Sequence, residues 1–475
     1  MPPSPAYQPA TTHADLGPDF YDPVDAATFP QHILRHRDQR WAARVGLDGL
    51  TNEEWVRHFG GFEPLPGSFP RPLALRYHGH QFRSYNPDLG DGRGFLFAQL
   101  RDVRDGRLLD LGTKGSGRTP WSRGGDGKLT LKGGVREVLA TSVLEALGVY
   151  TSKSFSLVET GEALHRGDEP SPTRSAVLVR LSHSHIRIGS FQRQAFLERP
   201  DNIGRLLDHA VRHYLPEAAR NDPAEQAAAF LQAVVARVAA LGAQWMAAGF
   251  VHGVLNTDNI NVTGESFDYG PWRFLPTYQP EFTAAYFDHS GLYAYGRQPD
   301  TLLWNLLRLA ECLLPLADKA GLEEALRGFA PQFGAALDAA VLRRLGLQGQ
   351  GAERDGALAQ AWWEFLHESG MGFEQAFFDW HGNQPARAAR SPEAAAYDTP
   401  AFAPVRGALA AYAPAPGTRL DHPYFARDKP CTMLIEEVEA LWAPIAERDD
   451  WSAFHAKLAE IEGMRDAYGT GTSVV

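Results

Sequence analysis

The sequence has few of the residues that mark secreted, zinc-binding or membrane proteins. Only two of its 475 residues are cysteine, Cys312 and Cys431, which excludes a disulfide framework and a cysteine-based zinc site. No Lys or Arg precedes Arg35, so the basic start of a secretory or transit peptide is missing. The longest stretch without a charged residue, 238–257, contains Gln, His, Asn and three glycines. It predicts a buried helix and a polar loop, not a membrane span. We therefore expect a soluble, cytoplasmic protein.

Basic residues are also in deficit. Lys and Arg number 46 against 57 Asp and Glu, a formal net charge of −11, which argues against a nucleic-acid-coating surface. Hydrophobic residues make up 44% and charged residues 22% of the chain, an ordinary globular composition. We therefore expect two or three structural units, with no nucleic-acid and no membrane partner.

Residue patterns divide the chain into four parts. Residues 1–60, rich in Pro, His and Asp, predict an irregular N-terminal extension, and 61–197 a β-rich small lobe of short apolar runs between glycine clusters. Residues 198–348 predict a helical large lobe, and 349–475 a C-terminal helical extension in which 401–416 is a Pro-rich connection. A β-rich half followed by an α-rich half predicts an α+β fold of two lobes with a cleft between them.

Local signals place the main elements. Asp105-Gly106 predicts a tight hairpin between strands at 95–103 and 107–114. A further strand is expected at 175–181, a short hairpin around Gly264-Glu265, and a helix with an apolar stripe over 135–147. Asp222-Pro223 and Gly249 are a start and stop pair for a long helix, and another helix begins near Asp300.

A glycine-rich turn precedes the first strand of the predicted hairpin. In Leu89–Gly94, Gly90 and Gly92 allow backbone amides to approach a polyphosphate, and Arg93 adds positive charge. Lys114 ends the second strand. This is the order of a kinase small lobe, in which the loop covers the phosphates and the strand lysine pairs with them.

An acidic partner for this lysine is expected on the next helix. Glu137 is the candidate that would orient Lys114 through an ion pair, and Glu145 on the same helix competes for the role. A helix carboxylate is most often simply solvated. The assignment to Glu137 rests on its order in the chain.

A second kinase-like segment lies in the helical half. His252 and Asn259 keep the spacing of the kinase His-x-Asp-x-x-x-x-Asn loop, and Asp268 opens an Asp-Tyr-Gly in place of Asp-Phe-Gly. Val254 stands where a kinase has its base, and a valine accepts no proton. Asp258 is the nearest replacement. Oxygen atoms from Asp258, Asn259 and Asp268 suit magnesium or manganese.

Basic residues gather in the predicted small lobe. The segment 114–128 carries two arginines and a second lysine, and Arg180 and Arg187 follow. In an acidic protein such arginines need anionic partners, either carboxylates or nucleotide phosphates. His78 and His80 predict a hydrogen-bonded structural role more than a metal site, and Cys312 a small core residue.

Together these segments resemble the selenoprotein O (SelO, or YdiU) family of protein adenylyltransferases. The matching segments are 79–82, 89–93, 114–127, 184–187 and 252–259, with 268–271. The resemblance implies a protein-kinase-like fold that binds ATP in a flipped orientation. It also implies transfer of AMP to Ser, Thr or Tyr hydroxyls of protein substrates, with release of pyrophosphate.

The resemblance also implies roles for individual residues. Asp258 would accept the proton, while Asn259 and Asp268 would bind Mg²⁺, or Mn²⁺ in its place. Glu137 would support Lys114. The nucleotide contacts that the resemblance implies are Gly90, Gly92, Arg93, Lys114, Asp126, Gly127, Arg180, Arg187 and Asp268.

The chain departs from the family at its C-terminal end. Some members carry a selenocysteine or cysteine there, whereas this chain ends Gly-Thr-Gly-Thr-Ser-Val-Val and Cys431 lies 44 residues earlier. No regulatory disulfide between Cys312 and Cys431 is therefore expected. Two alternatives remain. A conventional γ-phosphate kinase is disfavoured by Val254, and an inactive nucleotide-binding scaffold by the intact set of Lys114, Asp258, Asn259 and Asp268.

Overall fold

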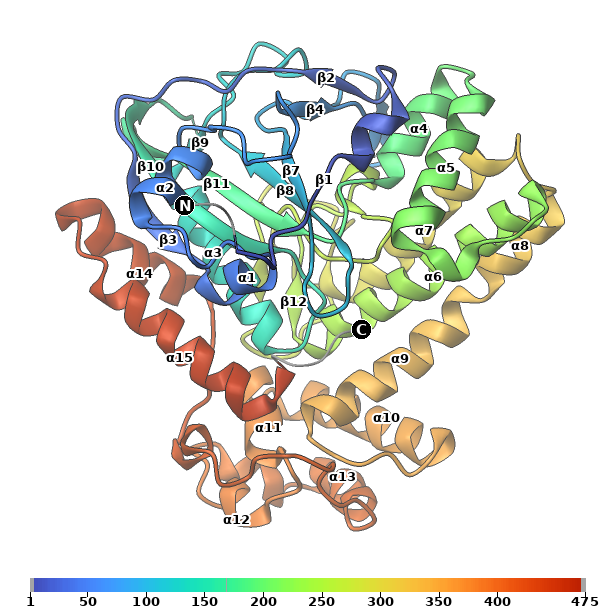
Figure 1. Cartoon of the computed structure of the whole chain (residues 1–475). Coiled ribbons are helices and arrows are strands. Elements are labelled where there is room, and N and C mark those ends of the chain that lie inside the picture. The colour runs from blue at the N-terminus through green and yellow to red at the C-terminus, as the bar shows by residue number, and fades with distance from the viewer. Residues whose placement is uncertain (1–3, 168, 471–475) are drawn as a thin grey trace.

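The computed structural model describes residues 4–167 and 169–470, a mixed α and β protein with one large sheet (Figure 1). Within that part of the chain the sheet has nine strands in the order β2-β4-β7-β8-β11-β10-β3, with β1 beside β7 and β9 beside β11, and every pairing is antiparallel. The strands are β1 Pro9–Ala10, β2 Tyr21–Pro23, β3 Ile33–Arg37, β4 Leu73–Leu75, β5 Gly79–Gln81, β6 Ser84–Asn86, β7 Leu96–Arg101, β8 Leu108–Lys114, β9 Leu129–Thr130, β10 Lys153–Leu164, β11 Thr173–Ser182, β12 Phe250–Val251 and β13 Arg273–Phe274.

Helices make up most of the remaining structure and are concentrated after the sheet. They are α1 Gln39–Arg44, α2 Asn52–Phe59, α3 Leu131–Ala146, α4 Ile188–Phe196, α5 Pro200–Tyr214, α6 Pro223–Ala247, α7 Gln298–Leu313, α8 Lys319–Arg327, α9 Phe329–Arg344, α10 Ala352–Ser369, α11 Phe373–Trp380, α12 Pro385–Ala388, α13 Ala403–Leu409, α14 Ile435–Arg448 and α15 Ser452–Tyr468. Short 3-10 turns join several of them, among them η1 Thr12–Leu16 and η3 Thr257–Asn259.

The N-terminal segment is not the irregular extension that its composition predicts. It contributes three strands to the large sheet, and β3 pairs with β10 at one edge. Trp41 of α1 and the fully buried Trp55 and Phe59 of α2 pack on the face of the sheet. The segment was predicted to be irregular because prolines and histidines in its connections dominate the composition. They conceal the apolar residues that pack on the sheet, so the prediction was wrong.

The predicted hairpin, strand and helix of the β-rich half are confirmed. Strands β7 and β8 pair as predicted, but residues 102–107 connect them, so the turn is longer than the predicted Asp105-Gly106 pair; Gly106 within it has a φ of 74°. Strand β11 contains the predicted strand at 175–181. Helix α3 packs against β10 and β11. The hairpin expected around Gly264-Glu265 is wrong. Gly264 N–H donates to the Asn261 carbonyl in a turn, and the flanking residues form single bridges to Arg187 and Thr151.

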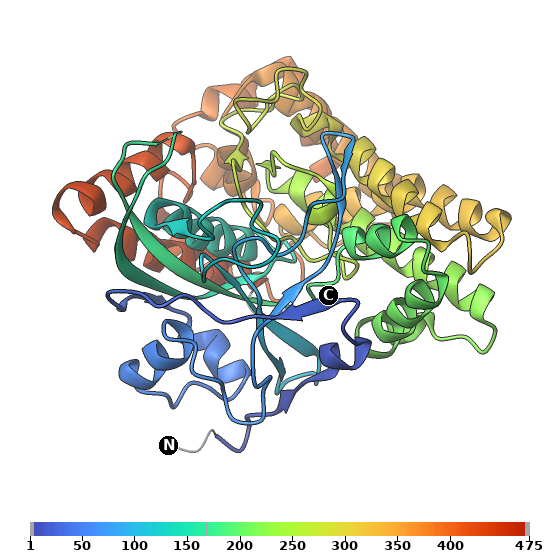
Figure 2. The ribbon, with the colours of Figure 1, turned by 90° about the horizontal axis from the view of Figure 1, so that it is seen from above.

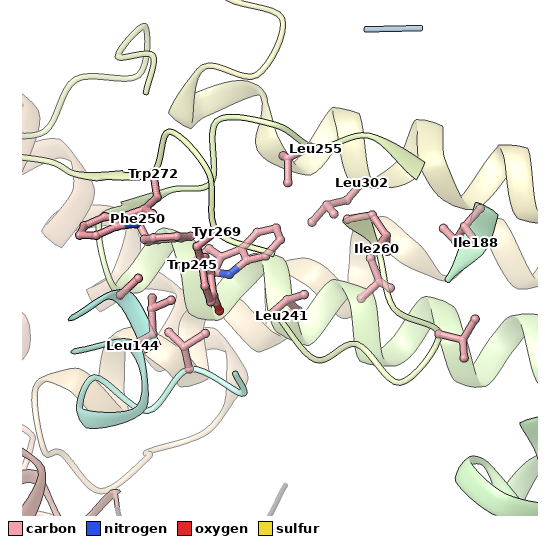
Figure 3. Packing of buried hydrophobic residues seen from close by; sticks show 14 of the residues in the cluster. Leu144, Ile188, Leu241, Trp245, Phe250, Leu255, Ile260, Tyr269, Trp272 and Leu302 are labelled. Carbon is pink, nitrogen blue, oxygen red and sulfur yellow. The ribbon is translucent and has the colours of Figure 1, made fainter. Parts of the chain in front are cut away.

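The long helix α6 begins and ends as predicted and forms the centre of the helical half. The Asp222 carboxylate accepts hydrogen bonds from the amides of Ala224 and Glu225, and Gly249 follows the last turn with a φ of 62°. Trp245 packs with residues of the 250–272 segment that lies beside the helix (Figure 3). Of the described helices, α6 alone has the length and apolar composition of a membrane span. The face of α6 that carries Trp245 is buried against neighbouring elements, as expected for the core helix of a globular protein.

The C-terminal helices form a second core and then return to the sheet. Residues of α10, α11 and α13 share one apolar cluster, and α13 lies inside the predicted Pro-rich connection. Helix α15 packs against α3, beside the N-terminal half of the chain (Figure 2). The first and last described elements, β1 and α15, therefore contact the same sheet and helix that position the functional site. The boundaries at residues 60, 197 and 348 stay predictions.

Candidate active site

A cleft of about 670 Å³ lies between the strand β7–β8–β11 region and the 256–268 segment. The two halves of the predicted site, one from the β-rich part and one after α6, meet there. Glu137 lies beneath the cleft with no exposed surface. The predicted residues that line the cleft are Gly90, Gly92, Arg93, Lys114, Asp126, Gly127, Arg180, Arg187, Asp258, Asn259 and Asp268.

Lys114 lies at the end of β8 within a buried group of alternating charges. Its Nζ is 2.6 Å from Glu137 Oε2 and 3.1 Å from Asp268 Oδ1. Arg180 on the neighbouring strand β11 is 3.4 Å from Glu137 Oε1 and 3.1 Å from Asp268 Oδ1. The antiparallel pairing of β8 with β11 brings the two cations together. Glu145 is instead engaged with Arg40 near the sheet edge, so the structure assigns the lysine partner to Glu137.

The Asp268 carboxylate faces three cations. Burial by itself would raise its pKa, but Lys114, Arg180 and Arg187 outweigh burial and hold the pKa well below its usual value. The residue has a φ of 62°, a left-handed conformation that is uncommon outside glycine. Asp268 is therefore held ionised at the floor of the cleft.

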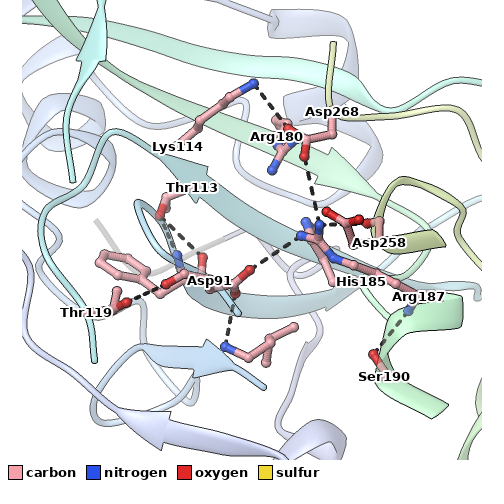
Figure 4. A network of polar contacts seen from close by, with 12 residues as sticks. Asp91, Thr113, Lys114, Thr119, Arg180, His185, Arg187, Ser190, Asp258 and Asp268 are labelled. Atoms are coloured by element: carbon pink, nitrogen blue, oxygen red, sulfur yellow. Dashed lines mark hydrogen bonds and ion pairs between the residues drawn. The ribbon is translucent and has the colours of Figure 1, made fainter. Parts of the chain in front are cut away.

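Arg187 connects the glycine-rich turn to the segment that carries Asp258 (Figure 4). The guanidinium is buried, donates to the backbone carbonyl of Asp258 at 3.0 Å and lies 3.4 Å from Asp91 Oδ1. It also stacks over the rings of Tyr77 and Phe267, at 4.3 and 4.9 Å from their centroids. A planar cation suits this position because it can donate in two directions and stack at the same time.

Asp258 lies on η3 with an unsatisfied carboxylate oxygen. Its Oδ1 is buried and accepts no hydrogen bond from any described residue. Burial raises the pKa of Asp258 to about 7, although Arg187 opposes the shift. An added Cβ at Gly79 would lie 2.8 Å from this oxygen, so strand β5 covers the carboxylate closely. A buried acid of raised pKa in a cleft is a candidate for proton transfer.

Close packing of the segment after β8 gives a second reason for the glycines of the turn. A Cβ at Gly90 would lie 2.4 Å from the ring of Trp121, and one at Gly92 would lie 2.8 Å from the Trp121 carbonyl. The segment after β8 therefore packs directly on the turn. Thr119 and Ser122 hydroxyls donate to the Asp91 and Gly92 carbonyls, both at 2.5 Å. Trp121 holds two cleft walls together.

Unpaired cations line the open part of the cleft. Arg93, Arg118 and Arg123 form no ion pair with any described carboxylate. By contrast, the Asp126 carboxylate receives two hydrogen bonds from Arg166, at 2.8 and 3.1 Å. Asp126 therefore orients Arg166 at the rim, and the free arginines provide positive charge for a phosphate-rich ligand.

The described residues include no group of three or more His, Cys, Asp and Glu side chains suited to a metal ion. A partial donor set is nevertheless present. Asn259 Nδ2 donates to the Val254 carbonyl at 3.0 Å, which leaves its Oδ1 available, and Asp258 and Asp268 line the same cleft. This set fits Mg²⁺, which retains several waters and binds through few protein oxygens together with substrate phosphates.

Several cleft residues were missing from the predicted set. Asp91 accepts from the Leu75 amide and pairs with Arg187, Trp121 packs under the turn, and Arg166 holds Asp126. Asn256 Oδ1 accepts a hydrogen bond from the Tyr293 hydroxyl at 2.8 Å. A signal for Asp91 existed, because it lies inside the glycine-rich turn. Nothing in the local sequence marks Arg166, which comes from the loop between β10 and β11.

The weaker suspects have structural roles. His78 Nδ1 lies 2.8 Å from the Tyr85 hydroxyl, and His80 Nδ1 lies 2.7 Å from Gln192 Nε2. Both cysteines are free and buried, which raises the pKa of each thiol to about 12. Cys312 and Cys431 are not bonded to each other in the structure. The C-terminal departure from the family, residues 471–475, lies outside the described residues.

A second buried carboxyl lies apart from the cleft. Glu265 accepts a hydrogen bond from the His183 amide at 2.7 Å. Burial raises its pKa to about 7; Lys153 and Arg107 oppose the shift and Asp110 adds to it. Glu265 therefore joins the turn after the Asp258 segment to the end of strand β11, and its charge state affects how firmly they are held.

A buried lysine, free arginines and a carboxyl of raised pKa lie together in one cleft, an arrangement typical of enzyme sites that bind phosphates. The family model of protein adenylyltransferase SelO matches residues 4–462. The chain belongs to this family and is a nucleotidyltransferase. The family and the enzyme class that the resemblance implied are both confirmed.

Curated relatives extend over most of the chain. A protein nucleotidyltransferase YdiU of Trichormus variabilis is 51% identical over 375 residues, 78% of this chain and 76% of its own length. One of Gloeobacter violaceus is 46% identical over 470 residues, 94% of this chain and 93% of its own length. One of Vibrio cholerae is 39% identical over 349 residues, 73% and 69% of the two chains. The similarity therefore includes both halves of the cleft.

Proposed function

We propose that the protein transfers AMP from ATP to Ser, Thr or Tyr hydroxyls of other proteins and releases pyrophosphate. In this reaction the hydroxyl oxygen forms a bond to the α-phosphorus, and the bond from that phosphorus to the pyrophosphate oxygen breaks. The proton of the hydroxyl passes to a base. The observation that carries the proposal is the buried, unsatisfied Asp258 Oδ1 in the same cleft as Lys114 and three unpaired arginines.

Asp258 is positioned to orient and accept the proton. Its pKa of about 7 gives a base that is partly ionised at neutral pH and a conjugate acid that forms readily. Arg187 fixes the backbone of Asp258 through the 3.0 Å hydrogen bond. A base of this kind contributes about 10²–10⁴-fold to the rate.

The cations of the cleft would bind the phosphates of ATP. Lys114 and Arg180 are held at the floor by Glu137, while Arg93, Arg118 and Arg123 lie along the more open wall. This distribution supports a flipped ATP, with its phosphates directed under the β-rich half. There the cations stabilise charge on the leaving pyrophosphate. The proposal includes a two-lobed, protein-kinase-like arrangement of the sheet and the helices around the cleft.

Asn259 and Asp268 would hold a Mg²⁺ ion, or Mn²⁺ in its place, together with phosphate oxygens. The ion would supply Lewis-acid stabilisation of charge on the transferred phosphoryl group. Lys114 and Arg180 each lie 3.1 Å from Asp268 Oδ1 and neutralise this carboxylate. Binding of ATP gives these cations phosphate partners and so frees the carboxylate.

A γ-phosphate kinase is the alternative that uses the same groups. Val254 is the residue at the usual position of the base, and its carbonyl is occupied by Asn259. It carries no side-chain acceptor, so Asp258 would have to act from another position. This favours AMP transfer.

The test is parallel incubation of the enzyme and an acceptor protein with α-labelled or γ-labelled ATP and Mg²⁺. We expect label on protein only from the α position, lost in Asp258→Asn and after chelation with EDTA. Asp258→Asn keeps the side-chain volume, and ATP binding measured by calorimetry serves as its control. Label from the γ position alone would show a kinase, and no label with intact ATP binding would show a nucleotide-binding protein without transferase activity on that acceptor.

A further inference from the structure

Three aromatic side chains form a partly exposed surface beside the cleft. Tyr286 is 79% exposed and Phe287 45%, although large apolar side chains are normally buried. Their rings are 5.1 Å apart, and Phe287 lies 5.7 Å from Phe82. We call the set of Phe82, Tyr286 and Phe287 the aromatic rim. Two of its members come from a loop after the Asp268 segment, and one from the β5–β6 hairpin.

The hairpin turn that presents Phe82 is strained. Strands β5 and β6 pair from Gln81 to Ser84, so Phe82 and Arg83 form a two-residue turn. Their φ values are 49° and 64°, the left-handed region that such turns normally fill with Asn and Gly. Strain of this kind is kept where the surrounding structure over-determines it, which happens most often at functional sites.

Hydrogen bonds from the Phe82 amide to Asn256 and Tyr293 hold this turn in place. The Phe82 amide donates to Asn256 Oδ1 and to the Tyr293 hydroxyl, both at 3.1 Å. The Tyr293 hydroxyl in turn donates to Asn256 Oδ1 at 2.8 Å, and the Tyr293 ring lies 4.7 Å from Phe82. Asn256 lines the cleft and is two residues from Asp258. Phe82 is therefore fixed to the segment that carries the proposed base, and Phe287 packs against it.

A hollow in the surface continues from the rim. It has a volume of about 650 Å³, lies along residues 280–297 and is bounded by Tyr286. Gln81, which precedes Phe82, lines the catalytic cleft itself. A chain that enters the cleft at Gln81 would therefore pass over Phe82 and Phe287 and could place side chains in the hollow.

We infer that the aromatic rim is the docking surface for the protein substrate, and that it binds an apolar side chain close in sequence to the acceptor hydroxyl. This inference rests on the proposed function, because that function requires a protein segment to reach Asp258. Exposed aromatic residues contribute strongly to protein binding when a partner covers them. The hydrogen bond of the Phe82 amide to Asn256 sets the distance between the bound apolar side chain and the base.

The test uses synthetic peptides that contain one Thr acceptor. In the reference peptide all other positions are Ala, Gly or Lys, and in a scanned set one of these positions is Phe. AMP transfer from α-labelled ATP is measured for the wild type, for Tyr286→Ala/Phe287→Ala, and for Leu314→Ala. Leu314 is 49% exposed and lies outside the residues that line the cleft, so it is a matched surface control.

We expect kcat/KM of the wild type and of Leu314→Ala to rise about tenfold or more when Phe occupies a favoured position. Tyr286→Ala/Phe287→Ala should lose this preference but keep the affinity for ATP and the rate with the reference peptide. An unchanged preference in the double variant would overturn the inference. So would an equal loss with both peptides, because it would show that these residues only support Asn256. A dimer that the double variant dissociates, with peptide labelling unaffected, would assign the rim to a second copy of the chain.

Failure of the proposed function would be recognised separately. If the wild type labels no peptide from α-labelled ATP, the Phe-containing peptide and the reference peptide are each tagged with a fluorophore. Their binding to the protein is then measured by anisotropy in the presence of ATP. Tighter binding of the Phe-containing peptide than of the reference peptide, lost in Tyr286→Ala/Phe287→Ala, would still support the docking surface. Equal binding of the two peptides would refute it.

Discussion

Replacement of Glu137 by Gln tests whether this carboxylate stabilises the folded protein by neutralising the buried cations beneath the cleft. The carboxylate has no exposed surface and contacts Lys114 at 2.6 Å and Arg180 at 3.4 Å. Gln has nearly the same shape but removes the charge, which leaves two buried cations with Asp268 as their shared anion. Loss of one partner of a buried pair costs about 3–5 kcal/mol. We expect the free energy of unfolding to fall by that amount.

The assay is denaturant unfolding at neutral pH, with and without ATP. Because ATP phosphates would supply the missing negative charge, its stabilising effect should be larger for Glu137→Gln than for the wild type. Glu439→Gln is the matched control, since Glu439 pairs with Lys132 at 2.7 Å on the surface. Its expected loss is below about 1 kcal/mol. A loss for Glu137→Gln as small as that of the control would refute the reasoning.

Two other substitutions test separate parts of the structure. Trp121→Ala removes the ring that packs under Gly90, so both cleft walls should loosen and the Kd for ATP, measured by calorimetry, should rise about tenfold, a loss of ~1.4 kcal/mol. Trp121→Phe should lie between it and the wild type, and an unchanged Kd for Trp121→Ala would contradict this role. Burial raises the pKa of Glu265 from its ordinary value of 4.5 to about 7, so the folded state holds more protons than the unfolded state between these values. Stability from this group is therefore present at low pH and is lost as pH rises toward 7. Glu265→Gln should remove that part of the slope in unfolding experiments between pH 4.5 and about 7, and parallel curves for variant and wild type would contradict the buried, protonated carboxyl.

Local sequence signals were sufficient where short-range geometry decides the structure. Asp105-Gly106 has the chemistry of a tight turn, and Asp222-Pro223 that of a helix start, so the elements around them could be predicted. The N-terminal strands could not. Their pairing with β4, β7 and β10 joins residues far apart in the chain, and strand preference depends on such neighbours more than on the residues themselves.

The site shows the same division. Lys114, Asp258, Asn259 and Asp268 carry chemistry that their residue types and spacing already indicate, and they could be named without a structure. The choice between Glu137 and Glu145 depended on which face of α3 lies under Lys114, and the contact of Gly90 with Trp121 on how two loops pack. Residue type and chain order determined which groups can bind phosphate and move a proton. Only tertiary packing decided their partners, because burial and contacts between distant segments determine which charges face one another.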